Sequence, residues 1–295
     1  ITAGLRYTDE KATKVDHYVE VLGTEIITNA DQELSTGDFT WRLSVDHDIT
    51  DDLLGYLSYN RGLKSGGFTI TTPTNLPPFY PETLDAYEAG LKFSDGGFNV
   101  NVAGFLYKFK DIQVQKVITG GIAVLNAAKA TFWGVDADFS YRPSRNFSVY
   151  GSVGYTNGEY DDFQDADQYP ASPLSPPLPT FDASGQTTVN TPRFTGTFGF
   201  DYTVPTKMGN FVLNGLYTHS DKRYLAPDNR LALDAFDVVN ASLAWRSVDE
   251  TLEARVWANN LFDEQYWAGG TSAAIGDTIF QAPPRTFGVR LSVFY

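Results

Sequence analysis

PRTFGVRLSVFY, residues Pro284–Tyr295, alternates apolar and polar side chains. Because successive side chains of a β-strand point to opposite faces, this period of two predicts a strand with one apolar and one polar face. The apolar face carries Phe287, Val289, Leu291, Val293 and Tyr295. The polar face carries Thr286, Gly288, Arg290 and Ser292.

Eleven further stretches read as strands, so the sequence predicts an all-β protein of about twelve strands. Several are longer than the roughly 9–11 residues that cross a membrane, and we expect these to project beyond it. The twelve predicted strands are Ile1–Asp9, Asp38–Asp48, Leu53–Gly62, Thr83–Ser94, Gly97–Val117, Ile122–Tyr141, Asn146–Gly158, Thr191–Val204, Asn210–Ser220, Ala235–Arg246, Thr251–Phe262 and Arg285–Tyr295.

The connectors between these strands alternate between short and long. The short ones, built from turn-forming Gly, Pro, Asp and Ser, are 49–52, 95–96, 142–145, 205–209 and 247–250. The long ones are 10–37, 63–82, 159–190, 221–234 and 263–284, with a shorter member near 118–121. Outer-membrane barrels have short periplasmic turns and long outer loops. We therefore expect Ile1 and Tyr295 at the periplasmic end.

Aromatic residues flank the short connectors and indicate a membrane boundary. The chain has no run that approaches the roughly 20 apolar residues of a membrane helix. Amphipathic rings favour the headgroup level, so this row predicts a periplasmic girdle of a transmembrane antiparallel up-and-down β-barrel. A soluble antiparallel sheet with one solvent-exposed face shows the same alternation of side chains. It does not require aromatic residues to lie in a row at one end of its strands. The row comprises Phe93, Phe98, Tyr141, Phe147, Tyr202, Phe211 and Trp245.

The polar strand faces are expected to line the lumen of this barrel. An Arg or Lys that faces lipid at mid-membrane costs about 2–4 kcal/mol, so charged residues within strands belong on the inner side. A specific role for them is to hold a domain inside the barrel, and the alternative is a solvated residue without a specific partner. The lumen candidates are Asp136, Asp138, Asp201, Arg255 and Arg290.

Composition excludes several classes of function. The formal net charge of −14 excludes nucleic acid as a partner. The chain has no Cys, and its three His are scattered, so we expect neither a metal site nor a cofactor. Catalysis is not expected, because His219 and its neighbours Ser220 and Asp221 point to opposite faces of a strand. A twelve-strand outer-membrane lipase is the enzyme alternative and requires a Ser close to His219 across strands.

Six segments, in this order, resemble the barrel of TonB-dependent outer-membrane receptors. They cover nearly the whole chain, and NNLFDEQY is the most specific of them. The segments are YLSYNRGLKSGGF (Tyr56–Phe68), PETLDAYEAGLK (Pro81–Lys92), GFLYKFKDIQV (Gly104–Val114), NAAKATFWGVDADFSY (Asn126–Tyr141), NNLFDEQY (Asn259–Tyr266) and PRTFGVRLSVFY (Pro284–Tyr295).

This resemblance implies an active transporter in the bacterial outer membrane for a scarce ligand. The expected ligand is a ferric siderophore, and the alternatives are a cobalamin-like compound and an oligosaccharide. Plugged transporters have about 22 strands, so we expect residues 1–295 to be the C-terminal part of such a barrel, without its N-terminal plug domain and first strands. The implied partners are the lipid bilayer with lipopolysaccharide, the plug, TonB through the missing N-terminal region, and the ligand. The last strand, with its terminal aromatic, resembles the signal read by the barrel assembly machinery.

Ligand recognition is expected in the long loops. The Glu159–Asn190 loop is acidic, lacks Lys and Arg, and contains the polyproline-like segment Pro170–Pro179. Its carboxylates suit Ca²⁺ or a cationic ligand, but their spacing matches no known Ca²⁺ loop, and a mobile acidic surface is the simpler interpretation. The Leu63–Glu82 loop combines basic and aromatic groups that suit an anionic chelate or a sugar, or that pack on neighbouring loops. The candidates are Lys64, Phe68, Phe79, Tyr80, Tyr160, Phe163, Tyr169 and Trp267.

Two non-enzymatic alternatives stay open at this point. A passive porin or closed twelve-strand barrel predicts that the first and last strands pair with each other. A surface barrel that binds a protein partner predicts that the long loops, including Pro170–Pro179, carry the binding.

Overall fold

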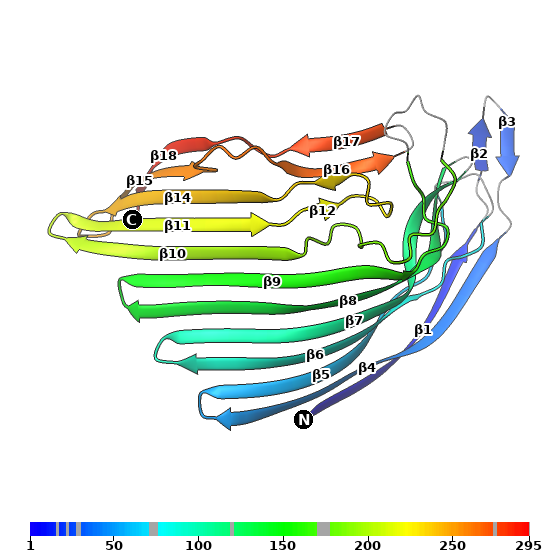
Figure 1. Cartoon of the computed structure of the whole chain (residues 1–295), viewed down its shortest axis with the longest axis horizontal. Coiled ribbons are helices and arrows are strands. Elements are labelled where there is room, and N and C mark those ends of the chain that lie inside the picture. The colour runs from blue at the N-terminus through cyan, green and yellow to red at the C-terminus, as the bar shows by residue number, and fades with distance from the viewer. Residues whose placement is uncertain are drawn as a thin grey trace.

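The computed structural model describes residues 1–15, 18–21, 24–27, 31–70, 76–118, 121–169, 178–273 and 276–294. Twelve antiparallel strands form one curved sheet (Figure 1). Their bounds, in sheet order, are β1 Thr2–Lys14, β4 Gln32–Thr50, β5 Leu53–Lys64, β6 Glu82–Asp95, β7 Phe98–Ile118, β8 Gly121–Ser144, β9 Phe147–Asp162, β10 Phe194–Thr206, β11 Gly209–Ser220, β14 Phe236–Arg246, β15 Leu252–Asn259 and β18 Thr286–Val293. The all-β prediction and the strand count are confirmed.

Three small hairpins extend the long loops at one end of the sheet (Figure 1). They pair β2 Tyr18–Val21 with β3 Thr24–Ile27, β12 Arg223–Tyr224 with β13 Ala232–Leu233, and β16 Trp267–Ala273 with β17 Gly276–Gln281. No helix among the described residues is long and apolar enough to cross a membrane.

The opposite end of the sheet consists of tight turns. Between β6 and β7, Gly96 and Gly97 have φ angles of 56° and 81°, in the left-handed region that glycine enters without steric cost. Two positive φ angles in succession match the twist of the flanking strands, so Asp95 pairs directly with Phe98. The short connectors are thus turns, as their composition predicts.

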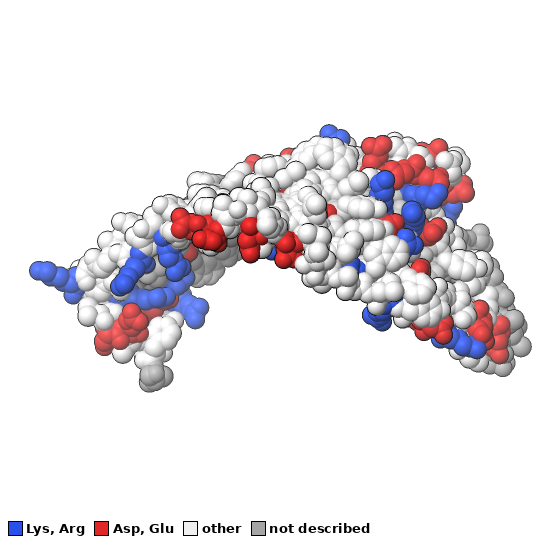
Figure 2. Space-filling view, turned by 90° about the horizontal axis from the view of Figure 1, so that it is seen from below, with Lys and Arg blue, Asp and Glu red and all other residues white. Residues whose placement is uncertain are grey.

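Strand register separates an apolar and a polar face throughout the sheet. On β15 and β18, Val256 lies opposite Val289 and Ala254 opposite Leu291, while Arg255 lies opposite Arg290. The apolar side chains are largely open: Phe287 is 80% exposed and Leu291 is 78% exposed. Apolar side chains that are this exposed and that line one face of neighbouring strands suit an apolar environment, which a bilayer provides. Figure 2 shows charged side chains of both signs at the two ends of the arched molecule and a few acidic side chains between them.

The aromatic row at the turns lies on this apolar face, as predicted. The ring centroids of Phe93 and Phe98 are 6.1 Å apart, and those of Phe98 and Tyr141 are 5.6 Å apart. The row continues with Phe147 and Tyr202 at 5.8 Å. Phe211 and Trp245 are directly opposite each other on the next two strands.

The two outermost strands of the sheet are β1 and β18. Among the described residues, β1 pairs with β4 and β18 pairs with β15, and the two outermost strands do not pair with each other. Figure 1 shows them at opposite margins of the sheet. This arrangement contradicts the closed twelve-strand barrel, which needs that pairing to satisfy the backbone groups of both edges.

Candidate functional site: outer loops and inner face

The β5–β6 loop is fixed at its base by polar contacts. Gly67 and Phe79 exchange two backbone hydrogen bonds of 2.9 Å. The side-chain amide of Asn126 on β8 accepts from the Tyr80 amide at 2.6 Å and donates to the Tyr80 carbonyl at 2.8 Å. The Tyr80 side chain itself is 61% exposed. The loop therefore presents this ring from a fixed backbone.

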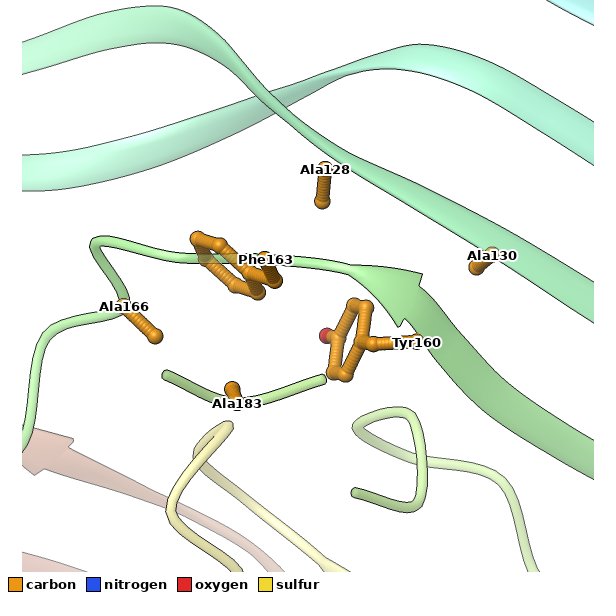
Figure 3. Close-up of a cluster of buried hydrophobic side chains, with 6 residues drawn as sticks. All are labelled: Ala128, Ala130, Tyr160, Phe163, Ala166 and Ala183. Atoms are coloured by element: carbon orange, nitrogen blue, oxygen red, sulfur yellow. The ribbon is translucent and has the colours of Figure 1, made fainter. Parts of the chain in front are cut away.

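The β9–β10 loop has a hydrophobic core of its own (Figure 3). Tyr160 and Phe163 are 6% and 3% exposed, and their ring centroids are 5.1 Å apart. Four alanines surround the rings: Ala128, Ala130, Ala166 and Ala183. The two on β8 belong to the NAAKATF stretch, where small side chains leave room for the rings. This burial gives both rings a structural role and places them out of reach of a ligand in this arrangement.

Side-chain contacts connect the β9–β10 loop to the β11–β14 loop, and the β11–β14 loop to the β16–β17 hairpin. The Asn229 side chain in the β11–β14 loop accepts from the Thr187 amide at 3.0 Å and donates to its carbonyl at 2.9 Å. Arg230 makes a bidentate pair with Asp277 of the β16–β17 hairpin at 2.7 and 2.8 Å. This pairing lowers the pKa of the Asp277 carboxyl from its ordinary value.

We expect acid to release the β16–β17 hairpin from its neighbour. Because the pKa of Asp277 is lowered in the folded state, its contribution to stability is present above the ordinary value of 3.8 and is lost as pH falls through the lower folded value. The protection of the hairpin amides, measured relative to their intrinsic exchange rate at each pH, should therefore fall below about pH 4. In an Asp277→Asn variant the hairpin should already exchange fast at neutral pH, and a wild-type hairpin with pH-independent protection would contradict the assignment.

The acidic residues of the Glu159–Asn190 loop have separate partners. Asp161 accepts from Thr131 at 2.7 Å, Asp162 pairs with Lys129 at 3.3 Å, and Asp182 accepts from the Ser184 amide at 2.9 Å. Hydrogen bonds from Ser184 lower the pKa of Asp182. Among the described residues, no three His, Asp or Glu side chains gather in a metal-binding arrangement. Most of Pro170–Pro179, namely residues 170–177, lies outside the described residues.

The other loop candidates remain at the outer end of the sheet. Lys64 is 3.4 Å from Glu82, and the Phe79 ring lies against Gly67. Tyr169 donates to Asp167 at 3.1 Å, and burial together with this carboxylate raises the pKa of Tyr169 to about 12. Trp267, 36% exposed, begins β16, and Phe68 is half-buried.

A cleft that no sequence pattern predicted lies between the β9–β10 and β11–β14 loops. It has a volume of about 380 Å³. Its charged and aromatic lining consists of Arg193, Lys222, Tyr224 and the acidic Asp221, and the Lys222 ammonium is 5.1 Å from the ring centre of Tyr224. Basic and aromatic residues also singled out the loop that contains Lys64. The corresponding residues of this cleft are divided between two loops, with Arg193 in one and Lys222 and Tyr224 in the other, so the sequence does not show them together.

The register places all five lumen candidates on the polar face, and hydrogen bonds join several to neighbouring strands. Asn101 donates to Asp138 at 2.8 Å. Asp201 accepts from Ser148 and from Asn214, which also accepts from Ser242 at 3.1 Å. Polar side chains thus form ladders across the inner face.

His219 is engaged by two carboxylates. Its Nδ1 is 2.8 Å from Asp237 and its Nε2 is 3.2 Å from Asp221. Both ring nitrogens are therefore occupied, and neither is available to activate a Ser. This geometry does not support the lipase alternative.

A curved antiparallel sheet with an apolar belt, an aromatic girdle, a polar inner face and long outer loops defines a bacterial outer-membrane β-barrel protein. The chain belongs to the TonB dependent receptor-like β-barrel family, whose model matches residues 1–261. This family comprises receptors and transporters rather than enzymes.

Relatives and solved structures of this family cover most of the chain. The pesticin receptor of Yersinia enterocolitica is 24% identical over 282 residues, which are 92% of this chain and 38% of that protein. The ferric-pyoverdine 358 receptor of Pseudomonas putida is 26% identical over 233 residues, which are 76% of this chain and 25% of that protein. The ferric yersiniabactin uptake receptor FyuA from Yersinia pestis shares the fold, with a TM-score of 0.83, 20% identity, and coverage of 99% of this chain and 43% of that one. The chain thus spans less than half the length of these proteins.

Proposed function

We propose that this chain is the C-terminal part of a larger, plug-bearing barrel of about 22 strands that imports a ferric siderophore with energy delivered through TonB. The single observation that carries the proposal is the combination of a lipid-facing exterior with a continuous polar inner face. A wall with these two faces encloses an aqueous bore, and β1 and β18 each leave an edge for further strands.

The relatives support iron as the cargo. The similar proteins include receptors for ferric pyoverdine and ferric yersiniabactin. A cobalamin-like compound or an oligosaccharide is the alternative cargo. In this proposal the plug and TonB contacts lie outside residues 1–295, and lipopolysaccharide and the assembly machinery contact the lipid-facing wall and the last strand. Tyr295, the terminal aromatic of that strand, lies outside the described residues.

The outer loops are the proposed recognition surface. Tyr80 is the strongest contact, because its backbone is fixed and its ring is exposed. The other proposed contacts are Lys64, Phe68, Phe79, Tyr169 and Trp267, to which the structure adds Arg193, Lys222 and Tyr224.

The proposal is tested by uptake in the host bacterium. Deletion of the gene should abolish accumulation of radioactive iron from one ferric siderophore in a panel of defined chelates, and the complete gene should restore it. Removal of TonB should abolish the same uptake while leaving binding at 4 °C intact. Uptake that proceeds equally without TonB would favour a passive pore and overturn the proposal.

A further inference from the structure

Two adjoining hollows open on the apolar face of β4, β5, β6 and β7. Their volumes are about 630 and 510 Å³, and both are lined by Val45, Leu57, Ala89 and Gly104. Ala89 and Gly104 are opposite each other in register, and the exposed Leu57 and Val135 lie on either side of them. The nearest atom to a Cβ at Gly104 would be a backbone oxygen at 3.8 Å, so the space above it is open. The two hollows thus form one apolar furrow along the wall, which we call the wall groove.

A cluster of basic side chains, which we call the basic cluster, lies beyond the outer end of the wall groove. Arg61, Asp85 and Lys108 are successive register partners on β5, β6 and β7, and Lys110 follows on β7. Lys108 lies four residues beyond Gly104 and therefore shares the face of the groove. Arg61 and Lys110 pair with Asp85 at 3.3 and 3.6 Å, whereas Lys108, among the described residues, is exposed and has no side-chain hydrogen bond or ion pair. The cluster thus holds three cations and one carboxylate, whose side chain is 10% exposed.

The basic cluster lies at the outer boundary of the membrane. Lys108 is ten residues beyond the periplasmic girdle residue Phe98 on the same strand, and roughly 9–11 strand residues cross the hydrocarbon core. Between the groove and the cluster, the rings of Tyr59 and Tyr87 stack with their centroids 4.5 Å apart. Aromatic rings next to basic side chains are typical of the headgroup level. The cations of the cluster therefore meet lipid headgroups, while the groove meets acyl chains.

The outer boundary at β11 and β14 carries the opposite charge. His219 is eight residues beyond the girdle residue Phe211, and the exposed Asp221 and Asp237 contact its two ring nitrogens. Two carboxylates thus share one imidazole on that part of the wall. In a chain whose net charge is −14, the basic cluster is therefore a local exception. An anionic headgroup is attracted to β5, β6 and β7 and repelled from β11 and β14.

We propose that the wall groove and the basic cluster together bind lipopolysaccharide of the outer leaflet, with a lipid A phosphate at Lys108 and Lys110 and an acyl chain in the groove. Charge complementarity selects the phosphate, because ammonium groups form their stronger hydrogen bonds with ionised oxygens. The groove selects a lipid over a free phosphate, because an acyl chain fills the apolar hollow and an inorganic anion leaves it open. The assignment rests on the proposed function only in requiring that the long loops face the cell exterior.

The test measures the Kd of fluorescent diphosphorylated lipid A for the complete protein in detergent micelles. The double variant Lys108→Gln with Lys110→Gln should raise this Kd at least about tenfold. Lys129→Gln is the matched control, because Lys129 lies on the neighbouring β8 but is balanced by Asp162 at 3.3 Å, and it should leave the Kd unchanged. Gly104→Leu fills the groove without adding a charge and should raise the Kd at least about threefold.

A second comparison needs no variant. Lipid A without its phosphates should bind the wild-type protein at least about tenfold more weakly than the diphosphorylated form. The proposal is overturned if the two lipids bind equally, if the double variant binds as Lys129→Gln does, or if phosphatidylglycerol binds as tightly as lipid A. Lipid binding is measured on purified protein without iron, and iron uptake is measured in cells. Failure of the proposed function therefore remains distinguishable from failure of this site.

Discussion

Leu291→Arg should nearly abolish accumulation of the protein in the outer membrane. Leu291 lies on the apolar face opposite Ala254, in the middle of β18, and is 78% exposed. A charge there faces hydrocarbon and costs about 2–4 kcal/mol at the bilayer midplane. The measurement is the amount of heat-modifiable, folded protein in outer-membrane fractions.

Ser292→Arg is the matched control for this prediction. Ser292 is the next residue but belongs to the polar face, opposite Glu253. The new arginine enters the aqueous side beside a carboxylate, so assembly should stay near the wild-type amount. Equal loss in both variants would mean that the two faces are not distinguished by lipid and water.

Phe163→Ala should open the β9–β10 loop without unfolding the barrel. The ring is 3% exposed and fills the small core shown in Figure 3. Removal of a buried Phe costs about 3–5 kcal/mol, because the transfer energy is lost and a cavity remains. Amide exchange in residues 163–169 and 178–186 should accelerate by at least about a hundredfold, while the β9 and β10 ladders stay protected.

Leu178→Ala in the same loop is the control, because this side chain is 45% exposed. It should leave exchange near the wild-type rate. Unchanged protection in Phe163→Ala would show that the cluster does not hold the loop.

The sequence predicts the strands and their faces because membrane and strand geometry constrain them locally. Alternation in Phe287–Val293 fixes the apolar face, and tight-turn residues such as Gly96 and Gly97 fix the short connectors. Several strands reach further outward than predicted, for example β1 to Lys14 opposite Gln32, because ladder pairing outside the membrane does not need apolar side chains. Others are shorter at this end, since β10 begins at Phe194 rather than Thr191 and β15 ends at Asn259 rather than Phe262.

The loop structure follows from contacts between distant segments and could not be predicted in the same way. Tyr160 and Phe163 look like exposed aromatic contacts in sequence, but the alanines that enclose them come from β8 and from the far side of the loop. The β16–β17 hairpin and its pairing with Arg230 likewise depend on two separate loops. Alternation predicts that Arg255 and Arg290 lie on the polar face, but their direct opposition is set by the strand register.

We expect lipid to cover one face of each strand and water to cover the other. The chain contains no Cys, so single cysteines at Val135, Asp136, Ala137 and Asp138 of β8 can each carry a spin label in the complete protein in lipid bilayers. Collision with oxygen should be high at 135 and 137, and collision with a water-soluble nickel chelate should be higher at 136 and 138 than at their neighbours. Equal accessibility at all four positions, or the reverse alternation, would contradict the account.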